Sequence, residues 1–252
     1  PLWSRGLGDV YKRQVHRICA ENMDQWSLPE ALAELEAAWP EIELSAEWQR
    51  SAELADAKAA VQRFDGWLQL RNRQLIGTEV RVDGTMTVPS GTARVRGSID
   101  RLERDAEGAY YVVDLKTGTS QSDEIKQSHR LQIGVYQAVV ASGGVEAIGP
   151  TSVSGAELVH LRIGAGIGQA NPKVDYQSGL VDVPWPDEAE PVDGCCNWVE
   201  ASVDKALRIV TSGEYPAIAN RGCGHCPARA GCPALVPMDP ATAGSDRRRN
   251  VP

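Results

Sequence analysis

Residues 97–118 constrain the fold of this chain more than any other segment. Their sequence, GSIDRLERDAEGAYYVVDLKTG, predicts two strands joined by a three-residue turn, in which Gly108 supplies the positive φ that such a loop requires. In that register residue i faces residue 214 − i, so Asp100 lies opposite Asp114. The Cβ atoms of such a pair are roughly 4.5–5.5 Å apart. Lys116 shares their face because strand side chains alternate.

Two carboxylates this close repel each other unless a cation lies between them or one of them is protonated. With a lysine beside them, they suit a divalent-metal site for hydrolysis of phosphodiester bonds. A single Asp-x-Lys on a strand is more often a solvated edge, and Arg101 could simply pair with Asp114 or Glu103 in a structural salt bridge. The opposed Asp100 favours the metal site.

The composition limits the kinds of partner. The chain has 252 residues, of which 42% are hydrophobic, so it can bury a core in one large or two small domains. Its net charge of −8 is not that of a free-standing nucleic-acid binder, which usually has a basic surface. Metal ions and a local basic cleft would have to hold a phosphate, with further affinity from another domain or subunit. Without an apolar run of about 18 residues or a secretory leader, we expect a cytoplasmic protein with no membrane partner.

Changes in pattern along the chain predict its organisation. An α/β core is expected, with a mixed sheet that contains antiparallel hairpins and is flanked by helices. Asp83-Gly84 predicts a hairpin turn between strands 78–82 and 85–88, and residues 164–192 are expected to be irregular. One domain is predicted over residues 15–237, between a foreign or disordered leader 1–14 and a disordered tail 238–252. The domain consists of a helical region 15–75, a catalytic core 76–163, and a C-terminal helix with the cysteine cluster at 194–237.

Three of the six cysteines, Cys223, Cys226 and Cys232, lie within ten residues. Cysteines that form structural disulfides are usually dispersed along a chain and do not cluster in this way. The three thiols are therefore interpreted as metal or cluster ligands. They could bind zinc together with His225 or an upstream thiolate.

Several motifs in one order resemble the RecB-like branch of the PD-(D/E)XK nucleases, which have a restriction-endonuclease-like core. The motifs are Gly97-x-Ile99-Asp100-Arg101, Asp114-x-Lys116-Thr117-Gly118, Gln132-x-x-x-Tyr136, the helical His16, and Cys223-x2-Cys226-x5-Cys232 followed by Pro233. The resemblance covers roughly residues 15–235. Each motif alone is weak, whereas several in the order of the family are specific.

The resemblance implies a role for each residue. Asp100, Asp114 and the backbone carbonyl of Leu115 would hold Mg²⁺ or Mn²⁺, and His16 would be a further ligand or a phosphate contact. Lys116 can orient the attacking water and offset charge that develops on the phosphate.

Gln132 and Tyr136 share a helix face and could contact the substrate or support Lys116. The ordinary alternatives are a packed or surface His16, and a Gln132 and a Tyr136 that belong to the helix surface and core. His129 and His160 are interpreted as structural or incidental.

For the cysteines the resemblance implies a [4Fe–4S] cluster, which needs four thiolates. In the family the fourth cysteine precedes the motif histidine, and this chain has no cysteine before His16. Cys19, Cys195 and Cys196 are unsupported substitutes, so the fourth ligand that the family implies is missing from this chain.

The sequence of the helix 28–39 and of the strand VVDLKTG most resembles the nuclease module at the C-terminus of actinobacterial AdnA/AdnB helicase–nuclease subunits. AddB is a more distant relative. This implies a deoxyribonuclease that cuts single strands delivered by a helicase domain or subunit during repair and recombination of double-strand breaks. No Walker A motif occurs, so the motor would lie elsewhere. The alternatives are a stand-alone RecB-family exonuclease and a catalytically silent, DNA-guiding module with a structural Fe–S or zinc site. Opposed carboxylates beside a lysine favour an enzyme.

Overall fold

A computed structural model describes residues 14–19, 26–42, 47–118, 123–166, 171–187, 189–219, 223–224 and 226–234, and for residues 123–129 the backbone alone. The chain divides into two compact units, Pro1–Lys205 and Ala206–Pro252. The sheet and every predicted site residue except the cysteine cluster belong to the first unit. The predicted tail lies outside the described residues, and so does the predicted leader except for Gln14, which begins a helical segment 14–19.

The first unit is built around a five-stranded mixed sheet with the strand order β1-β2-β3-β4-β5. Neighbouring strands are antiparallel except β3 and β4, which are parallel and are connected through the helix α4. Parallel neighbours need such a crossover because a tight turn can join only antiparallel strands. The sheet confirms the predicted α/β fold. The strands are β1 Gln74–Val88, β2 Gly91–Arg104, β3 Tyr110–Lys116, β4 Val153–Gly164 and β5 Pro172–Ser178.

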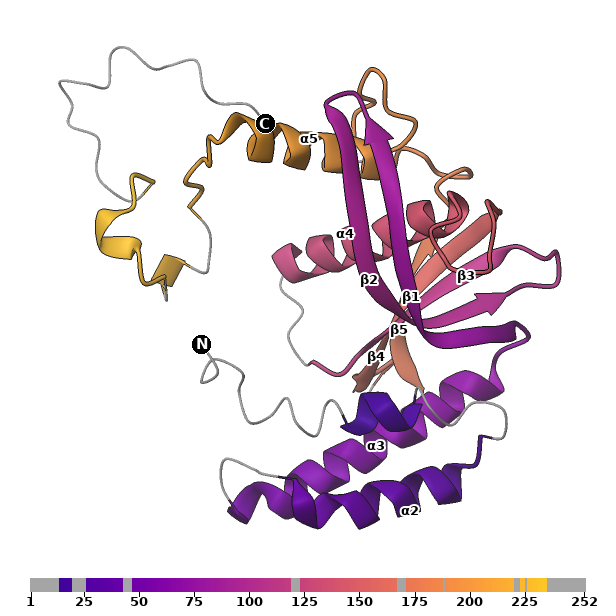
Figure 1. Cartoon of the computed structure of the whole chain (residues 1–252). Helices are drawn as coiled ribbons and strands as arrows, with labels where there is room; N and C mark the ends of the chain where they lie inside the picture. Colours follow the sequence, from indigo (N-terminus) through magenta and orange to yellow (C-terminus); the bar gives the residue numbers. More distant parts are fainter. Residues whose placement is uncertain are drawn as a thin grey trace. The chain divides into compact units, whose positions relative to one another are not determined.

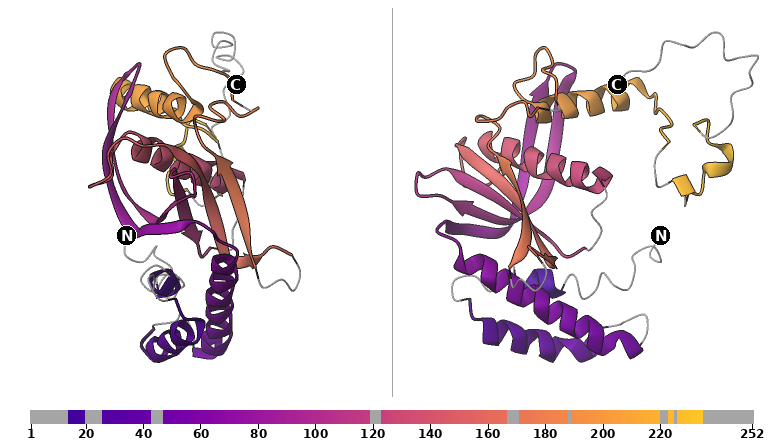
Figure 2. Two further views of the ribbon diagram at one scale, coloured as in Figure 1. Left: turned by 90° about the vertical axis from the view of Figure 1, so that its right-hand side faces the viewer. Right: turned by 180° about the vertical axis from the view of Figure 1, so that it is seen from behind.

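Helices lie on both faces of this sheet (Figures 1 and 2). The helices α2 and α3 pack on one face and α4 on the other. No helix in the described part of the chain is both long enough and apolar enough to cross a bilayer. The α-helices are α2 Leu28–Ala38, α3 Arg50–Gln69, α4 Asp123–Ala141 and α5 Trp198–Ser212, and short 3₁₀ helices are formed by Trp39–Glu41, Glu47–Gln49 and Arg229–Gly231.

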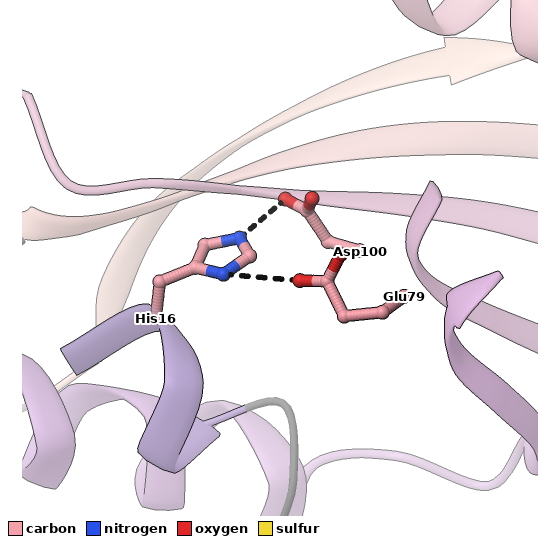
Figure 3. A group of neighbouring side chains, drawn as sticks. All are labelled: His16, Glu79 and Asp100. Atoms are coloured by element: carbon pink, nitrogen blue, oxygen red, sulfur yellow. Dashed lines mark ion pairs between the residues drawn. The ribbon is translucent and has the colours of Figure 1, made fainter. Parts of the chain in front are cut away.

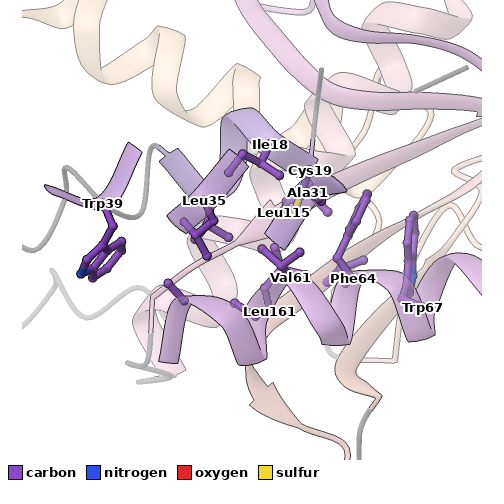
Figure 4. Packing of buried hydrophobic residues seen from close by; sticks show 14 of the residues in the cluster. Ile18, Cys19, Ala31, Leu35, Trp39, Val61, Phe64, Trp67, Leu115 and Leu161 are labelled. Atoms are coloured by element: carbon purple, nitrogen blue, oxygen red, sulfur yellow. The ribbon is translucent and has the colours of Figure 1, made fainter. Parts of the chain in front are cut away.

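Two hydrophobic clusters separate along the central strand β3. Val113 and Leu115 point into the cluster that α2 and α3 cover, whereas Val112 points into the cluster under α4. Figure 4 shows the first cluster, to which Phe64 and Trp67 of α3 and Leu115 of β3 belong. Because β3 is buried on both faces, its first residues are consecutive apolar residues without alternation. The packing on both faces holds the residues at the end of β3 in fixed positions.

The hairpin of β2 and β3 has the predicted register. The pairs from Arg104–Tyr110 to Arg101–Val113 all obey the expected relation. Gly108 has φ +88°, and the Asp105 amide donates to the Ala109 carbonyl at 2.9 Å to close the loop. The sequence-based geometry of this hairpin is therefore confirmed up to Arg101–Val113, one pair before Asp100 and Asp114.

The hairpin predicted at Asp83-Gly84 is wrong, because β1 runs without interruption from Gln74 to Val88. The chain reverses between β1 and β2 instead, after Val88. Gly84 has another role: a Cβ there would lie 2.9 Å from Val139 Cγ1 and 3.1 Å from the Gly144 Cα. A glycine that permits close approach of a helix end has the same sequence appearance as a turn glycine.

Two further boundaries differ from expectation. The predicted helical region 15–75 ends early, because α3 stops at Gln69 and β1 begins at Gln74. The segment 164–192, expected to be irregular, contains β5, which pairs antiparallel with β4 at the edge of the sheet. An edge strand has one partner and a largely solvated face, so its residues lack the hydrophobic alternation that marks a half-buried strand.

Candidate active site

Three groups from distant parts of the chain meet beside the sheet. His16 Nδ1 lies 3.3 Å from a Glu79 carboxylate oxygen, and His16 Nε2 lies 3.0 Å from an Asp100 carboxylate oxygen (Figure 3). One ligand atom from each residue can be chosen so that all three lie within 4.8 Å of one another. This is the spacing of groups that can share one metal ion.

The helical segment 14–19 holds His16 in place through its own packing. Val15, Ile18 and Cys19 are buried in the cluster formed with α2 and α3, and they occupy one face of the helix. His16 lies off that face and is only partly buried, so its ring reaches β1 and β2. The structure thus places His16 beside Glu79 and Asp100, and its role as a ligand stays a prediction.

Asp100 ties β2 to the end of β3. Its Oδ2 atom accepts a hydrogen bond of 2.6 Å from the Leu115 backbone amide and also faces the His16 ring. Asp100 and Asp114 lie one position beyond the last ladder pair, Arg101–Val113, at the end of the β2–β3 ladder away from the turn. The backbone of Leu115 is therefore next to the site, as expected, while its side chain is in the core.

Lys116 connects Asp114 to the helix α4. Its Nζ atom lies 2.7 Å from Asp114 Oδ2 and donates a hydrogen bond of 3.0 Å to Gln132 Oε1. The structure thus brings Asp114, Lys116 and Gln132 together, with Gln132 in contact with the lysine. Arg101 pairs with Glu103 at 2.5 Å, which is the structural alternative considered for it.

The site has an excess of negative charge. Burial, together with the charge of Asp100, raises the pKa of Asp114 to about 6 even though Lys116 and His16 favour its ionised form. Burial alone would lower the pKa of His16, but the hydrogen bond to Asp100 and the charges of Asp100, Glu79 and Asp114 raise it. Both shifts have the direction expected when carboxylates gather without enough positive charge.

Glu79 is the site residue that the sequence reasoning missed. It has φ +46°, a left-handed conformation that is uncommon for a residue other than glycine. The flanking pairs Thr78–Arg101 and Val80–Ile99 place it opposite Asp100. A turn predicted after Val88 would have given the β1–β2 register that places Glu79 opposite Asp100. The turn expected at Asp83-Gly84 instead paired the first half of β1 with its own second half.

Tyr136 and His160 lie near this group without joining it. The Tyr136 ring packs against Gly97, where a Cβ would lie 2.8 Å from the Tyr136 hydroxyl. His160 is next to Lys116 in the β3–β4 ladder, and its Nε2 atom lies 2.8 Å from Asp175 Oδ2. The structural reading of His160 agrees with this buried pair, while His129 has no described side chain.

The cysteine cluster belongs to the second unit. Within the described residues, Cys223, Cys226 and Cys232 do not form a group spaced for one metal ion. His225, the possible zinc ligand, lies outside the described residues. Cys19, considered as a fourth ligand, is buried in the core of the first unit, and burial raises the pKa of its thiol. Three thiolates do not complete a [4Fe–4S] cluster, so the cluster stays a prediction and no step of the reaction is derived from it.

Comparisons with known proteins agree with the motifs. Residues 9–233 match the model of the PD-(D/E)XK nuclease superfamily. No curated protein matches the chain significantly. Among solved structures, 24 chains match, and one of them is the crystal structure of SSO0001. It is 16% identical, with a TM-score of 0.41, over 90% of this chain and 98% of that chain.

Proposed function

The chain belongs to the PD-(D/E)XK nuclease superfamily, and on this premise we propose that it hydrolyses phosphodiester bonds of single-stranded DNA as the nuclease part of a helicase–nuclease. The observation that carries the proposal is the meeting of His16, Glu79 and Asp100 beside the buried pair of Asp114 and Lys116. The RecB-like motif order supports the exonuclease branch, and the likeness to helicase–nuclease subunits supports a motor partner.

The donor set fits a hard divalent cation such as Mg²⁺ or Mn²⁺. Carboxylate oxygens with one imidazole are the ligands that Mn²⁺ and related ions accept, and Mg²⁺ prefers carboxylates. The raised pKa of Asp114 supports the same assignment, because a buried carboxylate with too little positive charge around it is stabilised by a cation. We assign His16, Asp100, Asp114 and the Leu115 carbonyl to this ion, which when bound supplies Lewis acidity and a more acidic water.

The side chains of the site divide the remaining work. Lys116 holds the attacking water in line and offsets the negative charge that develops on the phosphate. Gln132 accepts a hydrogen bond from the Lys116 ammonium group through its amide oxygen. This contact points the ammonium group toward the reacting phosphate rather than into solvent. Tyr136 supports the strand at Gly97, three residues before Asp100.

Purified protein is expected to shorten 5′-labelled single-stranded DNA when Mg²⁺ or Mn²⁺ is added, and chelation with EDTA should abolish the cleavage because the ion supplies the water activation. The measurement is a gel time course with each metal and with EDTA. Duplex DNA of the same sequence is the control for strand preference. Cleavage that persists in EDTA after metal-free dialysis would contradict the proposal.

Glu79 has a separate role in this proposal, which is to orient His16. A ligating histidine commonly donates its second ring N–H to a carboxylate, which fixes the tautomer and the ring. Glu79 lies at His16 Nδ1 and Asp100 at Nε2, so Nε2 is the nitrogen left to face the ion. The Ser98 hydroxyl donates a hydrogen bond of 2.9 Å to the other Glu79 oxygen and holds the carboxylate in this position.

Glu79→Ala is expected to weaken Mn²⁺ binding by about 10–100-fold, which is the usual effect of losing such a partner. Glu79→Gln should lose far less, because the amide oxygen still accepts the His16 N–H. Calorimetric Mn²⁺ titration measures both affinities, and ESEEM spectroscopy detects the imidazole nitrogen on Mn²⁺. Equal losses in both variants would show instead that Glu79 is a direct ligand that needs its charge.

A further inference from the structure

The β1–β2 hairpin has one apolar face and one polar face. Val82, Met86 and Val88 are buried in the cluster that α4 and the beginning of α5 cover. Figure 1 shows this hairpin in front of α4, and the left view of Figure 2 shows α4 on one side of it only. The other face consists of the alternate residues, which are exposed.

Register places six of these exposed residues in three facing pairs. They are Asp83–Arg96, Thr85–Arg94 and Thr87–Thr92, and Arg81–Ser98 continues the series toward the site. We define this set of eight residues as the outer strip. It has three arginines and one aspartate, whereas the chain as a whole has a net charge of −8.

The charges of the outer strip are accessible. The side chains of Arg94 and Arg96 are 59% and 63% exposed, and both pair with the single acidic residue, Asp83, at 2.7 and 3.1 Å. Arg81 is exposed and has no ion pair among the described residues. Surface pairs of this kind contribute little to stability, so the arginines can exchange Asp83 for another anion at small cost.

The outer strip begins at the candidate active site. Ser98 is its end member and donates to Glu79, which is itself part of the group with His16 and Asp100. Residues on one face of a strand are about 6.8 Å apart and the two strands about 4.8 Å, so the strip is a narrow row of cationic and hydroxyl groups. It leads away from the site along the hairpin.

We propose that the outer strip binds the sugar–phosphate backbone of the single strand whose phosphodiester lies at the site. The inference rests on the proposed function and adds a substrate-binding surface to it. Arginine and hydroxyl groups are the usual partners of phosphate oxygens, and they position a strand without reading its sequence. A β-ribbon can also enter the major groove of a duplex, but the helices behind this one leave a single face accessible, which favours a single strand.

The test compares two charge-matched double variants in EDTA, so that binding is measured without cleavage. Arg81→Ala/Arg96→Ala removes two cations from the strip and leaves Arg94 to pair with Asp83. Lys58→Ala/Arg104→Ala removes two cations elsewhere, since Lys58 pairs with Glu36 and Arg104 with Gln74. Fluorescence anisotropy with a labelled oligothymidylate gives the affinity at several salt concentrations.

The strip variant should bind roughly tenfold more weakly than the control, and its log–log salt slope should fall by about 1.4, or about 0.7 for each lost phosphate contact. Asp83→Asn should bind more tightly than the wild type, an effect of opposite sign that misfolding cannot produce. Equal affinity of the two double variants for the oligothymidylate would overturn the proposal.

The proposed function is tested separately by wild-type hydrolysis of bis(p-nitrophenyl) phosphate, a phosphodiester too small to reach the strip. Failure of that hydrolysis with any metal would count against the nuclease assignment. It would leave the binding comparison in EDTA unchanged, so the two failures are distinguishable.

Discussion

Asp114→Asn is expected to lower kcat on single-stranded DNA by about 1,000-fold or more while the fold is retained. Asparagine keeps the shape of the side chain and removes the charge that would hold the cation, and such a cation is worth several kcal/mol of transition-state stabilisation. Its partner Lys116 remains in place to contact the amide oxygen. Single-turnover cleavage of labelled DNA at saturating Mg²⁺ measures the loss, with Glu47→Gln as a carboxylate control away from the ion.

The same variant should be more stable than the wild type when metal is absent. The folded-state pKa of Asp114 is about 6 against an ordinary value of 3.8, so between these values the folded protein holds the additional proton. The stabilisation that this proton gives to the folded state therefore decreases as the pH rises from about 4 to about 6, and it is fully lost above pH 6. The asparagine of the variant does not titrate, so the advantage of the variant should grow over this range to about 1–3 kcal/mol.

Urea denaturation in EDTA at pH 4.5 and pH 7.5 measures this difference. Asp175→Asn is a suitable control, because the pKa of Asp175, despite burial, is lowered by the hydrogen bond and charge of His160 and by Lys173. Its loss should destabilise the protein by similar amounts at both pH values, because a carboxyl whose pKa is lowered from 3.8 loses its stabilising effect only below that value. An Asp114→Asn protein that is less stable than the wild type at pH 7.5 would contradict the interpretation of a charge-strained site.

Glu103→Ala is expected to have the largest effect on stability, a loss of about 3–5 kcal/mol in the free energy of unfolding. Glu103 has no exposed side-chain surface, and its two oxygens contact Arg101 at 2.5 Å and Arg73 at 2.7 Å. Its removal leaves two largely buried guanidinium groups without this partner, and an uncompensated buried charge is expensive. Arg73 keeps Glu157, 3.1 Å away, and its stacking on the Tyr111 ring.

Glu47→Ala provides the matched control, because Glu47 forms an ion pair of similar length with Arg50 at the surface. Its removal should change the free energy of unfolding far less than Glu103→Ala does, because water screens the charges of an exposed pair. Urea titration followed by circular dichroism compares the two variants. Similar small losses in both would mean that the buried cluster of Glu103, Arg73 and Arg101 is relaxed by water and not held rigid.

The hairpin around Gly108 could be predicted from sequence because its information is local. A turn glycine, two strand patterns and the pairing rule fix the register, and the observed ladder follows it. Asp83-Gly84 failed for the opposite reason. The need for a glycine there comes from Val139 and Gly144, more than 50 residues away, and no local pattern distinguishes close packing from a turn.

The site was predictable only in part because it combines local and distant contacts. Asp114 and Lys116 are neighbours on β3, so their proximity follows from strand geometry. His16 could be assigned only through a family resemblance, since nothing local brings a helix before α2 to β2. Glu79 was hidden by its left-handed backbone and by the misplaced turn.

The packing of the segment 14–19 has a consequence for assembly. His16 is carried by the helical layer of Val15, Ile18 and Cys19, while Asp100 and Asp114 are carried by the sheet. An ion held by both would act as a crosslink between layers encoded some 80 residues apart, so its binding free energy would also resist their separation. The chelate and the tertiary docking of the first helix would then form and dissolve as one cooperative event.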